Sequence, residues 1–308
     1  MTQSTRSSSR PRVSEPPKSW AFEAIGTVWW IALYAIPRSV DIDFLYAKIQ
    51  KRIQKFDAVY SRFRDDSVVS GWASQAGSYP LPADALPLLD YYKQLYDITD
   101  GAVTPLVGQV LSDAGYDAQY SLRPVGELVA PPSWDEAFDY DDKTIHIKQP
   151  VLLDFGAAGK GYLVDILCEL LESEGVRAYC VDAGGDIRYR GPRGGDAFVV
   201  GLEHPDDAEQ VIGVVNLAGG SICGAAGNRR AWSKYHHIID PRRLKSPEHI
   251  KAIWVTAPSA MLADGLTTAL YFTSHETLLQ HFTFGYAIVH TDRSLLASGN
   301  FPAQFFTD

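Results

Sequence analysis

The chain has 308 residues, of which 46% are hydrophobic and 21% charged, and its formal net charge is −9 at pH 7. These values are typical of a globular protein and exclude a wholly disordered chain. A surface this acidic repels phosphate backbones, which disfavours nucleic-acid binding as the main function. The three cysteines, Cys168, Cys180 and Cys223, contain no CxxC pair, so we expect free thiols and neither a disulfide framework nor a zinc site.

The first 20 residues are rich in Ser, Pro and Arg, and we predict that they form a disordered leader. A secretory signal has an apolar segment after its positively charged start, and these residues are followed by none. The most apolar run, residues 22–37, contains Glu23 and is shorter than the ~20 residues that a membrane-spanning helix needs. We therefore expect a single domain over residues 21–308, no membrane span and a cytoplasmic location.

The apolar pattern of the first half predicts a strand, two helices and an irregular segment. Residues 24–35 have the β-branched and aromatic content of a buried strand. Residues 41–63 repeat apolar side chains at three- and four-residue steps, which predicts a helix. A second helix is predicted over residues 83–98, with Gly101 just after its end. Residues 102–142 are interpreted as a surface excursion with short elements.

The second half alternates between short apolar strands and a few helices. Helices are predicted over residues 161–171 and 259–272, which carry apolar stripes. Strands are predicted over residues 143–148, 151–155, 178–185, 197–203, 211–217, 250–258 and 284–292. Runs of strands broken by few helices favour an α+β fold over a regularly alternating sheet.

A predicted strand, a loop of small residues and a helix follow one another in LLDFGAAGKGYLVD, residues 152–165. Backbone amides at the helix start, together with Lys160, would favour a phosphate group. The spacing differs from that of a P-loop, which disfavours a nucleotide triphosphatase. The alternative interpretation is tight packing of the helix on the sheet, with Lys160 in solvent.

Three further motifs carry polar side chains or glycines at defined positions. VDAGGDIRYRG, residues 181–191, places Gly184 and Gly185 between two strands, where an ordinary hairpin turn is the simpler interpretation. In KYHHIIDP, residues 234–241, adjacent histidines on a strand would face opposite sides, so one could be a general base and the other structural. A histidine whose hydrogen bonds are satisfied in the core is the alternative.

The fourth motif is APSAMLADGLTTALYF, residues 257–272. Asp264 and Thr268 are four positions apart and therefore project from one face of the predicted helix. A carboxylate beside a hydroxyl suits a hard cation such as Mg²⁺, and it equally suits a local hydrogen bond.

Taken together, these motifs resemble those of the FAD:protein FMN transferase family, the ApbE flavin transferases, over nearly the whole chain except the leader. AIGT, FDAVYSRFRDDSVVS and DGAVTPLVGQVL are similar to the family's MGT strand, its FSxYxxDSxL segment and its GxFDPTxGPL segment. LDFGAAGKGYLVD, AGGDIRYRG, HHIIDP and MLADGLTTAL resemble its DxGGxAKGYxVD, GGDIxxxG, HxIDP and ADALxTAL motifs.

The resemblance implies a fold of mixed sheets with packed helices, related to the T-fold, with two lobes around a central flavin-nucleotide cleft. It also implies a reaction in which FAD binds with Mg²⁺. A Thr or Ser hydroxyl of an acceptor protein attacks the FMN-side phosphorus, AMP leaves, and FMN stays on the acceptor as a phosphodiester.

By the family pattern, the Mg²⁺ ligands would be Asp264, Thr268 and the backbone carbonyl of Gly159. His237 would be the base or the group that handles the phosphoryl. Asp165 is expected to orient the loop before the helix of Lys160. The residues expected to contact the flavin nucleotide are Lys160, Gly184, Gly185, Ile25, Phe63 and Thr104.

Three segments depart from the family pattern. Residues 103–106 lack the acidic residue of FDPT, residues 225–227 replace TSG with Ala-Ala-Gly, and residues 242–244 replace R-T-G with Arg-Arg-Leu. These departures leave two alternatives open. One is a Mg²⁺-dependent FAD pyrophosphatase that uses water as the nucleophile, and the other is a non-catalytic flavin-binding protein.

Overall fold

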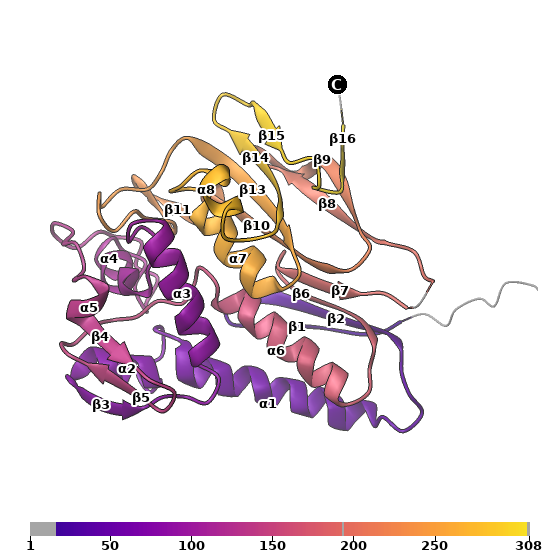
Figure 1. Cartoon of the computed structure of the whole chain (residues 1–308), viewed down its shortest axis with the longest axis horizontal. Helices are drawn as coiled ribbons and strands as arrows, with labels where there is room; N and C mark the ends of the chain where they lie inside the picture. Colours follow the sequence, from indigo (N-terminus) through magenta and orange to yellow (C-terminus); the bar gives the residue numbers. More distant parts are fainter. Residues whose placement is uncertain (1–16, 193, 307–308) are drawn as a thin grey trace, which may run out of the picture.

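The computed structural model describes residues 17–192 and 194–306, and an eight-stranded antiparallel sheet forms its centre (Figure 1). Side chains alternate between its two faces, as a pleated strand requires: Tyr179 and Val181 face one core and Cys180 faces another. The sheet is therefore buried on both sides. In spatial order its strands are β1 (Lys18–Ala24), β2 (Thr27–Ala35), β6 (Ala178–Ala183), β7 (Ile187–Arg190), β10 (Gly220–Ala226), β13 (Ile250–Ala257), β14 (Gly285–His290) and β15 (Leu295–Ala297).

Helices cover one face of this sheet (Figure 1). α6 (Gly159–Ser173) and α7 (Ala260–Ala269) pack against each other and against the central strands, and α1 (Ile42–Tyr60) packs on α6. The other face is covered by a three-stranded sheet of β8 (Phe198–His204), β9 (Asp207–Leu217) and β16 (Ala303–Phe305).

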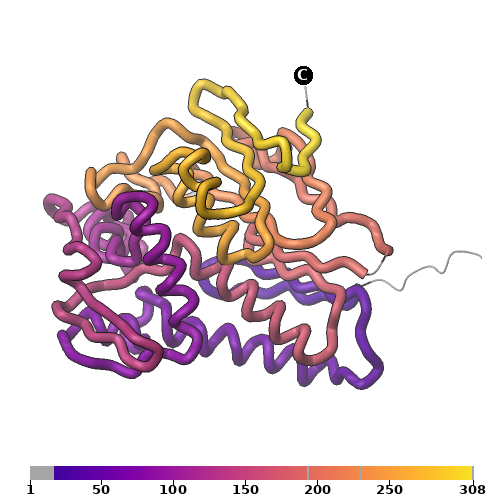
Figure 2. The backbone as a smooth tube through the Cα atoms, in the orientation of Figure 1, coloured from indigo at the N-terminus to yellow at the C-terminus, as the bar shows by residue number. Residues whose placement is uncertain are grey.

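The chain between α1 and α6 forms a smaller lobe at one end of the molecule (Figure 2). The segments after β10, which include α8 (His275–Leu279), lie next to this lobe. The lobe contains α2 (Val68–Ser74), β3 (Gly77–Pro80), α3 (Leu86–Ile98), η1 (Pro105–Val107), α4 (Gly108–Asp113), α5 (Trp134–Ala137), β4 (Phe138–Tyr140) and β5 (Thr144–Ile147). The segment after β10 contains η2 (Gly227–Arg230), β11 (Ala231–Trp232) and β12 (Tyr235–His236).

The predicted α+β class is confirmed, and most of the predicted elements are present within a few residues of their expected bounds. The prediction of a strand over residues 151–155 is wrong. The backbone N–H of Asp154 donates to the carbonyl of Pro105 at 2.7 Å, and Leu153 is fully buried. The apolar residues of this segment therefore fill the core between loops without joining a sheet.

Two other expectations need correction. Residues 102–116 are mostly buried, so the surface excursion begins only after them. β1 begins at Lys18, inside the predicted leader, because Trp20 and Phe22 pack on the core while the strand pairs with β2. Residues 1–16 of that leader lie outside the described residues. β10, which no pattern had indicated, pairs with β7 and β13.

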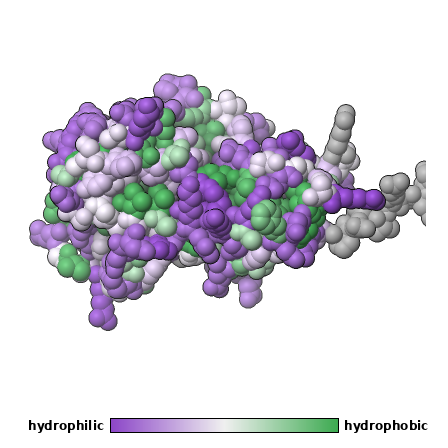
Figure 3. All heavy atoms as spheres, turned by 90° about the horizontal axis from the view of Figure 1, so that it is seen from below, coloured by the Kyte–Doolittle hydropathy of each residue, from purple (hydrophilic) through white to green (hydrophobic). Residues whose placement is uncertain are grey.

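The face of the molecule seen from below is largely polar. In the view from below, hydrophilic side chains cover most of the face and hydrophobic ones form separate patches (Figure 3). Within the ranges that the structure describes, no helix combines the length and apolar character that a membrane crossing requires.

The contact between α6 and α7 depends on Gly161, which yields a prediction for stability. A Cβ at this position would lie 2.2 Å from the carbonyl oxygen of Ala260 and 2.7 Å from Cβ of Asp264. We expect Gly161→Ala to push the helices apart and to lower the free energy of unfolding by about 1–3 kcal/mol. Urea denaturation measures this, with Gly71→Ala in α2 as the control, because a Cβ there meets nothing within 4 Å. Equal midpoints for Gly161→Ala and the wild type would contradict the packing argument.

Candidate functional site

A cavity of about 550 Å³ lies where the smaller lobe meets the main sheet. This volume is typical of a small-molecule site. Its walls come from the end of α1, the loop before η1, the loop before α6, the turns after β1 and β6, the end of β10, the segment after β12 and one face of α7.

All the predicted site residues line this cavity except one. The lining includes His237, Lys160, Gly184, Ile25, Phe63, Thr104, Asp264, Thr268 and Gly159. Gly185 does not line it; its amide donates to Asp182 Oδ1 at 2.8 Å. The sequence motifs thus converge on one place in the fold, although lining the cavity does not by itself assign their roles.

Lys160 lies in the first turn of α6 and is held from two sides. Its ammonium group donates to the carbonyl of Ala183 at 3.0 Å and forms an ion pair with Asp186, whose side chain is 1% exposed. Burial lowers the pKa of Lys160, but the carboxylates of Asp186 and Asp264 raise it by more than burial lowers it. The pKa therefore lies above its ordinary value, and the group stays protonated. The alternative of a lysine in solvent is wrong.

Asp264 projects from α7 toward the start of α6. Its Oδ2 accepts a hydrogen bond from the backbone amide of Gly161 at 2.9 Å. Burial raises the pKa of Asp264 well above its usual range, and the neighbouring carboxylate of Asp186 adds to this effect. Additional positive charge beside the carboxylate would offset this cost.

The residues expected to hold Mg²⁺ form an oxygen-only donor set. Asp264, Thr268 and Gly159 all line the cavity; Thr267 lines it too, but its hydroxyl donates to the carbonyl of Asp264 at 2.7 Å. Over residues 17–192 and 194–306 no cluster of three His, Cys, Asp or Glu side chains could hold a metal. A cation here would therefore depend on the hydroxyl and carbonyl oxygens beside one carboxylate, which is a donor set that fits a hard cation.

The two adjacent histidines have different environments. His236 is satisfied by the backbone: its Nε2 lies 2.9 Å from the carbonyl oxygen of Pro247, and its Nδ1 accepts from the amide of Ile238 at 3.3 Å. His237 lines the cavity, and its buried Nδ1 finds no hydrogen-bond partner in the part of the chain that the structure describes. Burial, with help from the charge of Arg230, lowers the pKa of His237 to about 3. His237 is therefore neutral at pH 7.

The glycine turn between β6 and β7 serves both interpretations given for it. Gly184 has a φ of +64°, and a Cβ there would lie 2.1 Å from the hydroxyl oxygen of Thr27. The hairpin therefore requires glycine at this position, and the same residue forms part of the cavity wall. The turn between β1 and β2 is also left-handed, with φ of +47° at Ile25 and +68° at Gly26.

Asp165 has a structural role, as expected, but it holds a different segment from the one expected. Its carboxylate accepts hydrogen bonds from the amides of Ala260 and Met261 at 2.9 and 2.8 Å, and from Arg188 at 2.6 Å. Asp165 thus binds the N-terminus of α7 and does not orient the loop before α6. The physical reason is that buried helix-end amides need an acceptor, and Asp165 lies beside them.

The sequence analysis missed an arginine that reaches the cavity. Arg62 is 6% exposed and forms a buried ion pair with Asp154, while its buried Nη2 has no hydrogen-bond partner within residues 17–192 and 194–306. Its guanidinium lies 4.2 Å from the ring centroid of Phe63 and 5.1 Å from that of Tyr116. The only sequence signal was its place beside Phe63 in the FSxY-like segment.

Aromatic rings continue this wall. Phe63 stacks on Tyr120 with centroids 5.1 Å apart and an interplanar angle of 7°, and Tyr116 meets both rings edge-on. Both tyrosines come from the segment that was expected to lie only on the surface. A wall of this kind fits a flat aromatic ligand.

The low pKa of His237 predicts a pH dependence of stability. An unfolded histidine has a pKa of 6.5 and that of folded His237 is about 3, so the unfolded chain binds the extra proton between these values. Stability is therefore lost as the pH falls from 6.5 toward 3. Between pH 7 and pH 5, we expect the wild type to lose about 2 kcal/mol more than His237→Gln. Urea unfolding at both pH values tests this, with the exposed His146→Gln as the control. Equal losses in wild type and His237→Gln would refute it.

Comparisons with known proteins agree with this geometry. A FAD:protein FMN transferase of Treponema pallidum is 27% identical over 312 residues, covering 89% of this chain and 83% of the relative. A FAD:protein FMN transferase of Klebsiella pneumoniae is 24% identical over 277 residues, covering 84% and 79%.

Solved structures share the fold. The ApbE protein of Thermotoga maritima has a TM-score of 0.80 at 22% identity and covers 94% of this chain and 100% of its own. The flavin transferase ApbE of Vibrio cholerae has a TM-score of 0.76 at 22% identity, with 93% and 99% covered. The model of the ApbE family matches residues 25–285, which is most of the chain. The chain therefore belongs to the ApbE family.

Proposed function

We propose that this protein transfers FMN from FAD to a Thr or Ser hydroxyl of an acceptor protein and releases AMP, in a Mg²⁺-dependent reaction. The observation that carries the proposal is the single cavity that joins Lys160, His237 and the oxygens of Asp264 and Thr268. Related proteins named FAD:protein FMN transferase support the same reaction.

The cavity has a place for each part of the flavin nucleotide. The stacked rings of Phe63 and Tyr120 suit the flat isoalloxazine, and the unpaired Nη2 of Arg62 would donate to one of its carbonyl oxygens. Lys160, a positive charge in the first turn of α6 that lines the cavity, suits the phosphates. Gly184 lets the backbone approach the ligand closely.

The chemistry requires a nucleophile, a proton acceptor and a leaving group. The acceptor hydroxyl oxygen forms a bond to the FMN-side phosphorus, and the bond from this phosphorus to the bridging oxygen breaks. AMP leaves with the electron pair, and the hydroxyl proton passes to His237. A neutral His237 can take this proton, and the negative phosphates beside it would raise its pKa and stabilise the protonated form.

Asp264, Thr268 and the carbonyl of Gly159 would hold Mg²⁺ at the wall formed by the start of α6 and one face of α7. When bound, the ion would neutralise the charge of the pyrophosphate and of the departing AMP. Lys160 lies in the same wall as a fixed positive charge. The magnesium requirement and the cytoplasmic location stay predictions.

The departures from the family pattern favour keeping the pyrophosphatase as a second candidate. Thr104 and Ala225 line the cavity at the positions where the family has an acidic residue and a hydroxyl. Polar contacts that would hold the substrate are therefore fewer on these walls. Water could then compete with an acceptor hydroxyl, and FMN and AMP would both be released.

One experiment separates these functions. The purified protein is incubated with FAD and Mg²⁺, with and without a flavodoxin-like acceptor that carries a candidate threonine motif. Intact mass and nucleotide chromatography then record the products. An acceptor that gains one FMN, together with free AMP, supports the transferase. Free FMN and AMP without acceptor modification support the pyrophosphatase, and bound, uncleaved FAD supports a non-catalytic binder.

Asp264→Asn tests the proposed metal site. The amide keeps an oxygen that can accept from Gly161, so the fold is retained, but the negative charge is lost. We expect metal-dependent FAD turnover to fall at least ~100-fold, a few kcal/mol of barrier. Exposed Glu169→Gln, on α6, is the matched control. Identical Mg²⁺ titration curves for wild type and Asp264→Asn would remove the metal assignment.

His237→Gln tests the proposed proton acceptor. The amide has nearly the same shape but does not take up a proton, so we expect the single-turnover rate of AMP release to fall on the order of 10²-fold. The dissociation constant of FAD, followed by flavin fluorescence, should change less than about threefold. A large loss of FAD affinity with an unchanged single-turnover rate would instead make His237 a binding residue.

A further inference from the structure

A second, open groove of about 930 Å³ lies beside the nucleotide cavity. One wall is the loop of residues 240–250, and the other is residues 270–275, which connect α7 to α8. We call it the basic groove. None of the predicted site residues lines it.

The basic groove and the nucleotide cavity are built from the same two chain segments. Residues 237–239 line the cavity, and the chain continues directly into residues 240–250 of the groove wall. Thr268 lines the cavity, and four residues later Phe272 lines both spaces. A molecule lying in the groove would therefore end beside Phe272, next to the wall that holds His237.

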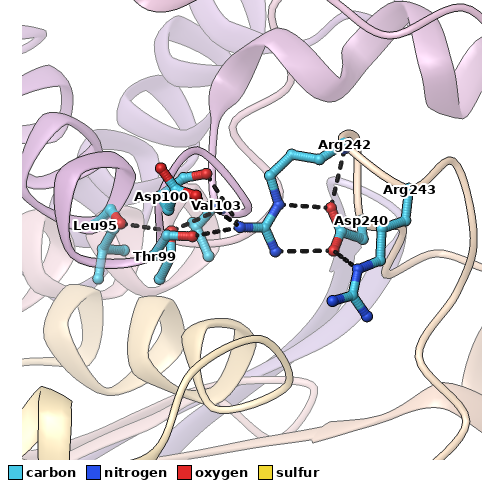
Figure 4. A network of polar contacts seen from close by, with 7 residues as sticks. All are labelled: Leu95, Thr99, Asp100, Val103, Asp240, Arg242 and Arg243. Atoms are coloured by element: carbon cyan, nitrogen blue, oxygen red, sulfur yellow. Dashed lines mark hydrogen bonds and ion pairs between the residues drawn. The ribbon is translucent and has the colours of Figure 1, made fainter.

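The floor of the groove is fixed by a polar network (Figure 4). Asp240 binds the guanidinium of Arg242 through two hydrogen bonds of 3.0 and 2.9 Å. The same guanidinium donates to the carbonyls of Thr99 and Asp100 at 3.0 and 3.1 Å, just after α3. Arg242 thus neutralises Asp240 and ties this loop to the smaller lobe, which leaves the neighbouring cations without a strong partner.

The remaining charges in the groove are mostly positive. The side chain of Arg243 is 81% exposed, and its contact with Asp240 is long, at 3.9 Å. Lys234 and Lys245 are exposed, and no carboxylate of residues 17–192 or 194–306 lies within ion-pair distance of either. Against these three cations the lining has one other carboxylate, Glu248. A positive patch in a chain of net charge −9 is a local feature that selects an anionic partner.

We propose that the basic groove binds the acceptor protein through an acidic segment that flanks the modified Thr or Ser. The proposal rests on the proposed function, which requires a second, protein substrate next to the first. Arg243, Lys245 and Lys234 would pair with Asp or Glu side chains of that segment, and the hydroxyl would enter the nucleotide cavity past Phe272. The net negative charge of the remaining surface would discourage acidic segments elsewhere.

Binding of a labelled peptide tests the groove without requiring catalysis. The probes are two fluorescein-labelled decapeptides with a central Thr, one flanked by Asp and Glu and the other by Lys. Fluorescence anisotropy with the full chain gives their dissociation constants at low and high salt. We expect the acidic peptide to bind at least tenfold more tightly than the basic one, and to weaken as salt increases.

Two variants locate the binding site. Arg243→Glu with Lys245→Glu should weaken binding of the acidic peptide at least tenfold, and the uncharged pair Arg243→Gln with Lys245→Gln should weaken it less. The matched control is Lys51→Glu with Lys55→Glu on α1, which changes the net charge equally at exposed positions and should change binding less than twofold. FAD affinity should be unaltered in all of them.

The outcomes separate this inference from the proposed function. Equal binding of the acidic peptide to the wild type and both groove variants overturns the groove assignment, as does equal binding of the basic peptide. Competitive displacement of the peptide by AMP would also overturn it and assign the groove to a nucleotide. If the peptide binds as expected but FMN never reaches any acceptor, the groove stands and the transferase proposal fails. FMN transfer by the wild type that is undiminished in the Arg243→Glu and Lys245→Glu variant leaves the transferase standing and removes the groove.

Discussion

The close approach of α6 to α7 is the constraint on which the site depends. The missing side chain of Gly161 lets the backbone of one helix reach the carboxylate of Asp264 on the other. This contact sets where Gly159 and Lys160 lie relative to Thr268. Gly159 and Lys160 are within two residues of Gly161 on α6, and Thr268 is one turn after Asp264 on α7. Asp165, about one turn further along α6, binds the first amides of α7 and adds a second contact to the pair. The chemistry is thus held by helix packing more than by loops.

This packing forces charged groups into a region with little water. Lys160 pairs with Asp186 and also feels the charge of Asp264, and Nη2 of Arg62 has no hydrogen-bond partner among the described residues. Burying charges in this way costs free energy unless another partner supplies the missing interaction. A nucleotide with its phosphates and a divalent cation would supply both signs of charge where the walls lack them. A bound nucleotide and cation would therefore account for the polar imbalance of these walls.

The fold class and most of the site followed from the sequence because the motifs are local. A strand, a small-residue loop and a helix are recognisable from neighbouring residues alone, as are Asp264 and Thr268 on one helical face. Arg62 and the two tyrosines of the aromatic wall were not recognisable, because their role arises from long-range packing against Phe63. Residues 151–155 failed for a related reason: their apolar pattern records burial, and a buried loop and a buried strand have the same pattern.

A transferase with two large substrates needs two separate binding sites that lie next to each other. The segment from His237 to Ile250 accomplishes this geometrically, since its first residues face the nucleotide and its later ones face the groove. Arg242 anchors its turning point to Asp240 and to the end of α3, so the two faces cannot shift independently (Figure 4). The departure from the family's R-T-G at residues 242–244 falls in this turn. If the proposed groove binds the acceptor, a change here would alter which acceptor is recognised without touching the residues proposed for the metal or His237, so this departure points to partner choice and not to loss of the reaction.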